Sequence, residues 1–130
     1  MRFKSARLLA STLLVAAAVA GCAQSPEKRE ETRLARLNYF FPSPAEQQGL
    51  HFVYAIESFG FFSNLEIGFY PDAVTQAEVM ARADAYCARQ TASRATDKAR
   101  LKYEPKDGPV ELADGTTRDM RTIWVTCLPE

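Results

Sequence analysis

The stretch TQAEVMARADAYC, residues 75–87, carries the clearest helix pattern in the chain. Glu78 follows Thr75 by three positions, which is the spacing of a capping box at a helix start. Apolar side chains then recur at helical spacing along one face: Val79, Met80, Ala83, Tyr86 and Cys87. We therefore predict a helix that begins at Pro71-Asp72 or Thr75 and carries Cys87 on its buried stripe.

The residues before this helix predict strands, because apolar and polar side chains alternate with a period of two. The first is expected over residues 35–41, ended by Pro42 and Pro44. The second covers residues 50–57, with Phe52, Tyr54 and Ile56 on one face, and the third covers residues 65–70. We expect the second and third to form a hairpin around residues 58–64. A short helix capped by Ser25, with Pro26 at its first position, is also compatible with the sequence.

Further strands are predicted after the helix. Ala99, Leu101 and Tyr103 alternate with charged residues, which is typical of a strand with one buried face, and residues 105–109 break it. Residues 110–112 and a strand from Thr117 onward are expected to pair across residues 113–116. On the last strand, over about residues 118–127, one face presents Ile123, Val125 and Cys127.

These patterns together predict an α+β fold. We expect a small antiparallel sheet of four to six strands with one helix packed on it, in the order strands, helix, strands. No internal repeat is visible in the chain.

The amino-terminal residues have the pattern of a secretory signal peptide. A basic start (residues 1–7) precedes 13 mostly apolar residues (8–20), which would span only about 20 Å as a helix. The run ends in Val19-Ala20-Gly21-Cys22, which resembles the lipobox of bacterial lipoproteins. The resemblance covers residues 1–22 and implies that cleavage follows Gly21 and that Cys22 carries lipid. An ordinary secreted protein that is cut nearby is the alternative.

The same resemblance implies a location and a domain organisation. Ala23 follows the cysteine where enterobacterial lipoproteins that stay in the inner membrane have Asp, so the outer membrane, on its periplasmic face, is expected. We predict a signal peptide over 1–21, a lipidated Cys22 with a charged tether over 22–33, and one domain over 34–130. Loss of Arg2, Lys4 and Arg7 from 16 basic residues leaves 13 against 16 acidic ones. This balance gives no reason to expect nucleic acid as a partner.

With Cys22 assigned to lipid, Cys87 and Cys127 remain as an even pair in an oxidising compartment. We predict a structural disulfide between them. Two buried free thiols or a reactive pair are the alternatives, but a redox role would favour a C-x-x-C motif or a neighbouring histidine. The chain has one histidine, His51, and no C-x-x-C motif.

No catalytic constellation is visible in the sequence. One histidine and two paired cysteines do not supply a set of metal ligands, so neither a metal site nor a cofactor is expected. His51 lies between Leu50 and Phe52 in a strand pattern, and neither a nucleophile motif nor a phosphate-binding loop is present. We therefore predict no enzymatic activity.

The aromatic residues between Tyr39 and Tyr70 are the remaining feature. They fill the core in the simplest interpretation. Adjacent aromatic residues on a strand point to opposite faces, however, so one of each pair is a candidate for exposure. The candidate binding patch is Phe59, Phe61 and Phe62 around Gly60.

Three functions remain open at this stage. The first is a lipid-anchored structural or protein-interaction module of the cell envelope. The second is a small-molecule or lipid-binding accessory protein that uses the aromatic segment 39–70. The third, an enzyme, would require acidic residues to cluster around His51.

Overall fold

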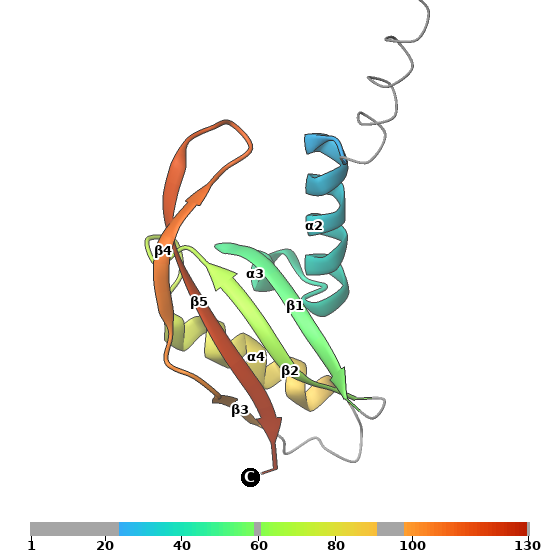
Figure 1. Cartoon of the computed structure of the whole chain (residues 1–130). Coiled ribbons are helices and arrows are strands. Elements are labelled where there is room, and N and C mark those ends of the chain that lie inside the picture. Colours follow the sequence, from blue (N-terminus) through green and yellow to red (C-terminus); the bar gives the residue numbers. More distant parts are fainter. Residues whose placement is uncertain (1–23, 59–60, 91–97, 130) are drawn as a thin grey trace, which may run out of the picture. The chain divides into compact units, whose positions relative to one another are not determined.

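The computed structural model describes residues 24–58, 61–90 and 98–129. The elements (Figure 1) are α2 (Pro26–Phe40), α3 (Pro44–Gln47), β1 (Leu50–Ser58), β2 (Phe61–Phe69), α4 (Gln76–Gln90), β3 (Lys98–Leu101), β4 (Lys106–Glu111) and β5 (Thr117–Leu128). The chain divides into two compact units, residues 1–31 and 32–130. Of the first unit only residues 24–31 are described, and they contain the beginning of α2. The second unit holds the sheet and is treated below.

The sheet is antiparallel and has five strands. Its order is β1-β2-β5-β3, and β4 also pairs with β5. Thr122 of β5 lies between Gly68 of β2 and Lys106 of β4, so β4 adds to the edge opposite β2. The mixed α+β class, with a helix packed on a small antiparallel sheet, is confirmed.

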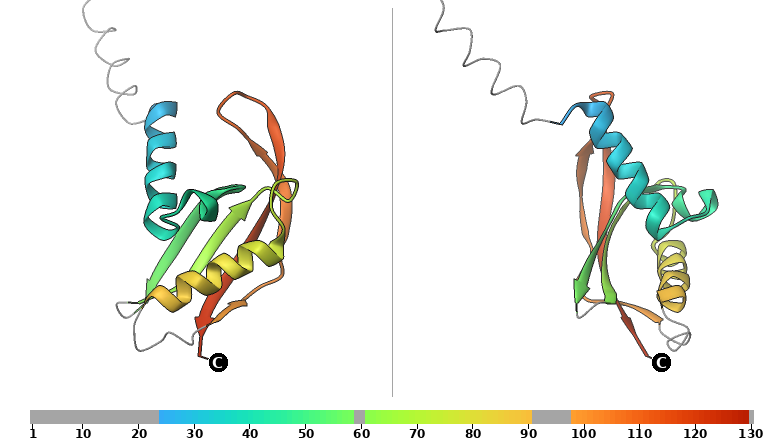
Figure 2. Two further views of the ribbon diagram at one scale, coloured as in Figure 1. Left: turned by 180° about the vertical axis from the view of Figure 1, so that it is seen from behind. Right: turned by 90° about the vertical axis from the view of Figure 1, so that its right-hand side faces the viewer.

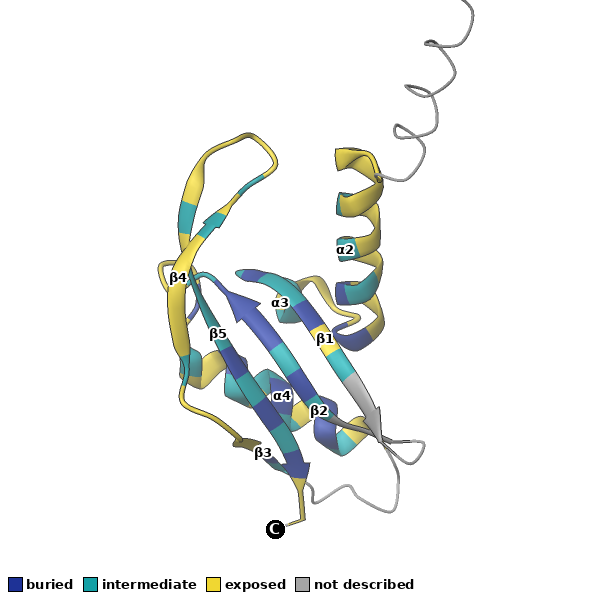
Figure 3. Ribbon diagram, in the orientation of Figure 1, coloured by how far each residue is buried: buried dark blue, intermediate teal, exposed yellow. Residues whose placement is uncertain are grey.

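Helix α4 covers one face of the sheet, as the view from behind shows (Figure 2). Its buried side chains are those of Val79, Ala83, Tyr86 and Cys87, as the apolar spacing predicts. They meet the alternate positions of the strands that are also buried: Val53, Leu65, Ile67, Phe69, Ile123 and Val125 (Figure 3). We call this covered side the inner face. Its period of two on the strands and the helical period on α4 define one shared core.

The start of α4 is set by the capping box that the sequence predicts. The Glu78 backbone N–H donates to the Thr75 hydroxyl at 3.2 Å, and the Thr75 backbone N–H donates to the Glu78 carboxylate at 2.8 Å. These bonds satisfy N–H groups that have no partner inside the helix. Hydrogen bonds from the Thr75 backbone and hydroxyl lower the pKa of Glu78, so this carboxylate stays charged at the positive end of the helix dipole.

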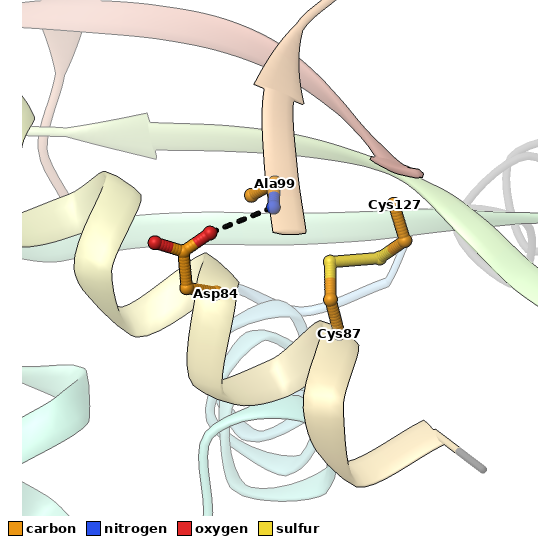
Figure 4. Close-up of a disulfide and its surroundings, with 4 residues drawn as sticks. All are labelled: Asp84, Cys87, Ala99 and Cys127. Atoms are coloured by element: carbon orange, nitrogen blue, oxygen red, sulfur yellow. Dashed lines mark hydrogen bonds between the residues drawn. A yellow bond between two sulfur atoms is a disulfide. The ribbon is translucent and has the colours of Figure 1, made fainter. Parts of the chain in front are cut away.

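The predicted disulfide is present and joins the end of α4 to the end of β5. Cys87 and Cys127 have Cα atoms 5.5 Å apart, and both residues belong to the buried core (Figure 4). One helical turn earlier, the Asp84 carboxylate accepts the backbone N–H of Ala99 at 2.7 Å. β3 pairs with β5 only through Lys98–Leu101. The Asp84 hydrogen bond ties α4 to β3, and the disulfide ties α4 to β5.

The strand predicted over residues 35–41 is wrong, since these residues lie in or directly after helix α2. Leu37, Phe40 and Phe41 are buried together at i, i+3 and i+4 spacing, which the alternating pattern concealed. The Lys28 backbone N–H donates to the Ser25 hydroxyl at 3.2 Å, so the predicted cap is present but starts a helix of 15 residues. Good helix formers before Leu37 favour this outcome over a strand.

Two predictions near the last strands also need correction. β3 ends at Leu101, and of the predicted face only Ala99 is buried, whereas Leu101 and Tyr103 are exposed. Residues 105–109 do not form only a break, because β4 begins at Lys106 and continues through Pro109. Proline is tolerated there because β4 is an edge strand that pairs with β5 alone.

Both predicted hairpins are present, although β2 begins at Phe61 rather than at residue 65, so residues 61–64 belong to the strand and not to the predicted loop. β1 and β2 form the expected hairpin, and β4 and β5 pair across residues 112–116, where Gly115 has φ +83°. Ile123, Val125 and Cys127 share the buried face of β5. The turn of the first hairpin, residues 59 and 60, lies outside the described residues.

We predict that loss of the Cys87–Cys127 bond lowers the free energy of unfolding by about 4 kcal/mol. The bond closes a loop of about 41 residues, and the entropy of the unfolded chain rises when the loop is opened. Denaturant unfolding of the oxidised protein and of a Cys87→Ala, Cys127→Ala double variant measures this difference. The double variant with added reductant serves as the control, and equal stability of oxidised and variant proteins would show that the bond is dispensable.

Candidate functional site

The face of the sheet opposite α4 is the candidate site, and we call it the outer face. Figure 1 looks onto it. Its central positions alternate with the buried core positions on β1, β2 and β5: Phe52, Tyr54, Glu66, Gly68, Thr122, Trp124 and Thr126. Helix α4 lies on the opposite face, and among the described residues Arg36 of α2 reaches the outer face, where it lies over Tyr54.

Strand register arranges the outer face in rows across the strands. Tyr54 pairs with Glu66, and Glu66 pairs with Trp124, so these three side chains form one row. In the next row Phe52 pairs with Gly68, and the Phe52 ring occupies the space above this glycine. A Cβ atom on Gly68 would lie 2.4 Å from Cε1 of Phe52. The absence of a side chain at Gly68 therefore leaves the space that the Phe52 ring occupies.

Cationic and aromatic side chains gather where β3, β4 and their connection meet β5. We call this group the basic–aromatic strip, and it consists of Arg100, Lys102, Tyr103, Lys106 and Trp124. The Tyr103 and Trp124 rings pack edge to face with their centroids 6.2 Å apart. Lys106 Nζ lies 5.7 Å from the Trp124 ring centroid, and Lys102 Nζ lies 5.5 Å from that of Tyr103. Both lysines are thus within cation–π range of a ring.

Register places the strip on the outer side. Lys106 pairs with Thr122 and Arg100 pairs with Thr126, and both threonines alternate with buried positions of β5. The Lys102 backbone N–H donates to the Trp124 carbonyl at 2.8 Å, which ties the β3–β4 connection to β5. The Tyr103 side chain is 58% exposed.

The cations of the strip differ from other cations of the same unit in their partners. Arg89 pairs with Glu46 at 2.8 Å, Arg118 with Asp72 at 2.9 Å and Arg121 with Asp107 at 2.6 Å. Among the described residues, by contrast, none supplies a carboxylate within 4.0 Å of Arg100, Lys102 or Lys106. Asp107 is next to Lys106 in the sequence, but its carboxylate accepts a hydrogen bond from Arg121, which lowers the pKa of Asp107. Asp107 is therefore paired with Arg121 and not with Lys106.

Elsewhere on the outer face, arginine guanidinium groups stack on tyrosine rings. The Arg36 guanidinium lies 4.5 Å from the centroid of the Tyr54 ring, and that of Arg118 lies 3.9 Å from the centroid of the Tyr70 ring. Arg118 also binds Asp72 through its Nε and Nη2 atoms. β2 pairs with β5 only from Arg121 onward, so this ladder does not hold the β4–β5 arm, residues 106–120. The contacts of Arg118 fasten the arm to Tyr70 and Asp72, which follow β2.

His51 is half-buried at the start of β1. Its Nδ1 lies 2.6 Å from the Tyr70 hydroxyl, and its backbone carbonyl accepts a hydrogen bond from Arg33 at 2.7 Å. These contacts link α2, β1 and the residue that follows β2. They give His51 a structural role. No group of three or more His, Cys, Asp or Glu side chains suited to a metal ion occurs in the described part of the chain.

The structure describes only some of the predicted site residues. Cys87 and Cys127 are joined. Cys22 and Phe59 lie outside the described residues, as do the side chains of Phe61 and Phe62, whose backbone begins β2. The predicted aromatic patch is therefore not described.

The aromatic segment 39–70 contains both core and surface residues. Phe40, Phe41 and Phe69 are buried, whereas Tyr39 and Tyr54 are exposed. The opposite-face rule holds for Phe69 and Tyr70, of which only the first is buried. It fails for Phe40 and Phe41, because they sit at a helix end rather than on a strand.

The basic–aromatic strip was missed at the level of sequence. A usable pattern exists, since Lys98, Arg100, Lys102 and Lys106 lie within nine residues. Trp124 is also out of phase with the core positions Ile123 and Val125. What the sequence does not provide is the pairing of β3 and β4 with the same strand, which brings Tyr103 and Lys106 to Trp124.

Comparisons with protein families, with curated proteins and with solved structures find no match to this chain. In the described ranges, the helices are too short or too polar for any of them to cross a membrane. The functional argument therefore rests on the geometry of the outer face.

We predict that Arg118→Ala loosens the β4–β5 arm. The variant loses an ion pair and a cation–π contact, so amide hydrogen exchange in residues 108–111 and 117–120 should become roughly tenfold faster. Exchange at Ile67 in the core should not change.

Arg100→Ala is the matched control, because Arg100 is an exposed arginine of β3 with no ion pair among the described residues. Unchanged exchange in the arm of Arg118→Ala, or equal acceleration in both variants, would contradict the fastening role of Arg118.

Proposed function

We propose that this chain is a lipid-anchored, non-catalytic interaction module of the cell envelope, which holds a protein partner on the outer face of its sheet. The observation that carries the proposal is the set of aromatic side chains on or beside the outer face, with Tyr54 and Tyr103 exposed and Trp124 half-buried, next to cations that lack carboxylate partners within the described residues. Tryptophan, tyrosine and arginine are the residues that most often dominate binding energy in protein interfaces.

The anchoring part of the proposal rests on the lipobox-like residues Val19 to Cys22. A lipid on Cys22 would place the sheet close to a membrane, and Ala23 favours the periplasmic face of the outer membrane. Several acyl chains give stable attachment, whereas one chain binds only marginally. The membrane is thus the second partner, contacted through the amino terminus.

The alternative function, a small-molecule or lipid-binding accessory protein, is less well supported by the packing. Phe40, Phe41 and Phe69 are packed in the core with Tyr86 and its neighbours. Phe52 lies on Gly68, and Tyr54 is stacked by Arg36. The described aromatic side chains of segment 39–70 are therefore used in packing or displayed on a sheet face, which suits a macromolecular surface better than a closed ligand site.

Site-specific photocrosslinking in intact cells tests the proposal. A photoreactive phenylalanine analogue placed at Tyr54 or Tyr103 should yield a discrete protein adduct, because both side chains are exposed on or beside the outer face. Tyr39 is the matched control: it is also an exposed tyrosine, but it contacts Phe40, whose ring meets Tyr86 of α4.

A Cys22→Ser version of the same chains tests anchoring. It should lose incorporation of labelled fatty acid and give a weaker adduct, since the module is released from the membrane. Equal adducts from Tyr39, Tyr54 and Tyr103, or none from the outer-face positions, would contradict the interaction role. Normal lipid labelling of Cys22→Ser would contradict the lipobox assignment.

A further inference from the structure

We propose that the basic–aromatic strip binds an acidic segment of the protein partner, with carboxylates seated on Arg100, Lys102 and Lys106 and the backbone lying over Trp124 and Tyr103. This inference rests on the proposed function and names the chemistry of the partner. It concerns one edge of the outer face, where β3, β4 and their connection meet β5.

Charge complementarity is the first argument. This unit neutralises Arg89, Arg118 and Arg121 with carboxylates of its own. Arg82 is also occupied, since it donates to the carbonyls of Glu46 and Gln48 at 2.9 and 2.6 Å. The strip concentrates three cations that have no such carboxylate in the described part of the chain, although the whole sequence has equal numbers of basic and acidic residues. A positive surface of this kind attracts and orients an anionic partner.

The aromatic rings supply the second argument. Trp124 and Tyr103 hold each other edge to face, and each has a lysine ammonium group near it. The rings hold the ammonium groups of Lys102 and Lys106 close to the outer face but do not neutralise their charge. An incoming carboxylate can therefore pair with the ammonium groups while its chain covers the rings, so ionic and apolar contacts form together.

The neighbouring residues favour a protein over an anionic membrane as the occupant. Glu66, in the same row as Trp124, limits the positive charge to a narrow strip, which fits a single chain segment better than a broad anionic membrane, and Thr122 and Thr126 flank the ring on β5. The Trp124 side chain is half-buried among its neighbours rather than projecting as an apolar wedge. Membrane-interface anchors instead combine projecting apolar side chains with surrounding cations.

The test measures adduct yield in intact cells from a photoreactive residue at Tyr54, which lies on the outer face but not in the strip. The yield is compared among full-length chains that carry Lys102 and Lys106 changed together to Arg, Met or Glu. We expect an unchanged yield for K102R/K106R, a loss of roughly threefold for K102M/K106M, and a loss of at least tenfold for K102E/K106E. This order is expected if the lysines act through their charge.

Lys28→Glu with Arg29→Glu is the matched control, because it makes the same change of charge at exposed positions of α2. Its yield should equal that of the parent chain. Formation of the Cys87–Cys127 bond, seen as faster migration without reductant, reports that each variant is folded. If the Glu variant does not accumulate, the comparison of the Arg and Met variants decides the result.

The outcomes separate this inference from the proposed function. An adduct with a protein that keeps its yield in the Met and Glu variants overturns the acidic-segment proposal and leaves the interaction role intact. An adduct with lipid instead of protein overturns the choice of partner. Absence of any adduct from both Tyr54 and Tyr103 overturns the proposed function and this inference together.

Discussion

The packing of one amphipathic helix, α4, against one face of the sheet is the constraint on which the rest of this structure depends. Its apolar stripe matches the inner positions of β2 and β5, and the Cys87–Cys127 bond fastens its last turns to the end of β5. A chain of this size buries only a small core, so a covalent link contributes a large fraction of its stability. Because α4 occupies the inner side, the outer side stays open within the described ranges, apart from Arg36 of α2 over Tyr54.

The outer face is built from the same strands and obeys the same period of two. Each core residue of β5 is preceded or followed by an outward residue, so burial of Ile123 and Val125 places Trp124 between them on the other side. Strand pairing then brings Lys106 and the β3–β4 connection to that tryptophan. The binding surface that we propose is thus a consequence of how the core is made.

Charge is distributed unevenly over this framework. Ion pairs fasten segments that have little apolar packing, such as the β4–β5 arm at Asp72 and the α3 turn at Arg89. The cations of the strip have no such task among the described residues, and they lie next to aromatic rings. Unneutralised cations gathered at one place have no such fastening role and therefore point more to recognition than to folding.

The sequence predicted the class of fold and the inner face well, because both depend on local periodicity. The helix start at Thr75, the buried stripe of α4, the two hairpins and the disulfide are all local or pairwise patterns. It failed over residues 35–41, where alternation and helical spacing coincide and the helix formers before Leu37 decide the outcome. The strip was not predicted, because its members come together only through the pairing of two short strands with β5.

The central claim, an open and positively charged outer face, is tested most directly by fluorescence quenching of Trp124, the only tryptophan in the chain. Iodide and caesium quenching constants are measured in the native and the unfolded protein, each relative to free tryptophan amide. The account predicts that iodide quenches the native protein clearly more strongly than caesium does, since Lys106 and Lys102 attract the anion, and that unfolding reduces this difference. Protection of Trp124 from both ions, or caesium quenching as strong as iodide quenching, would contradict it.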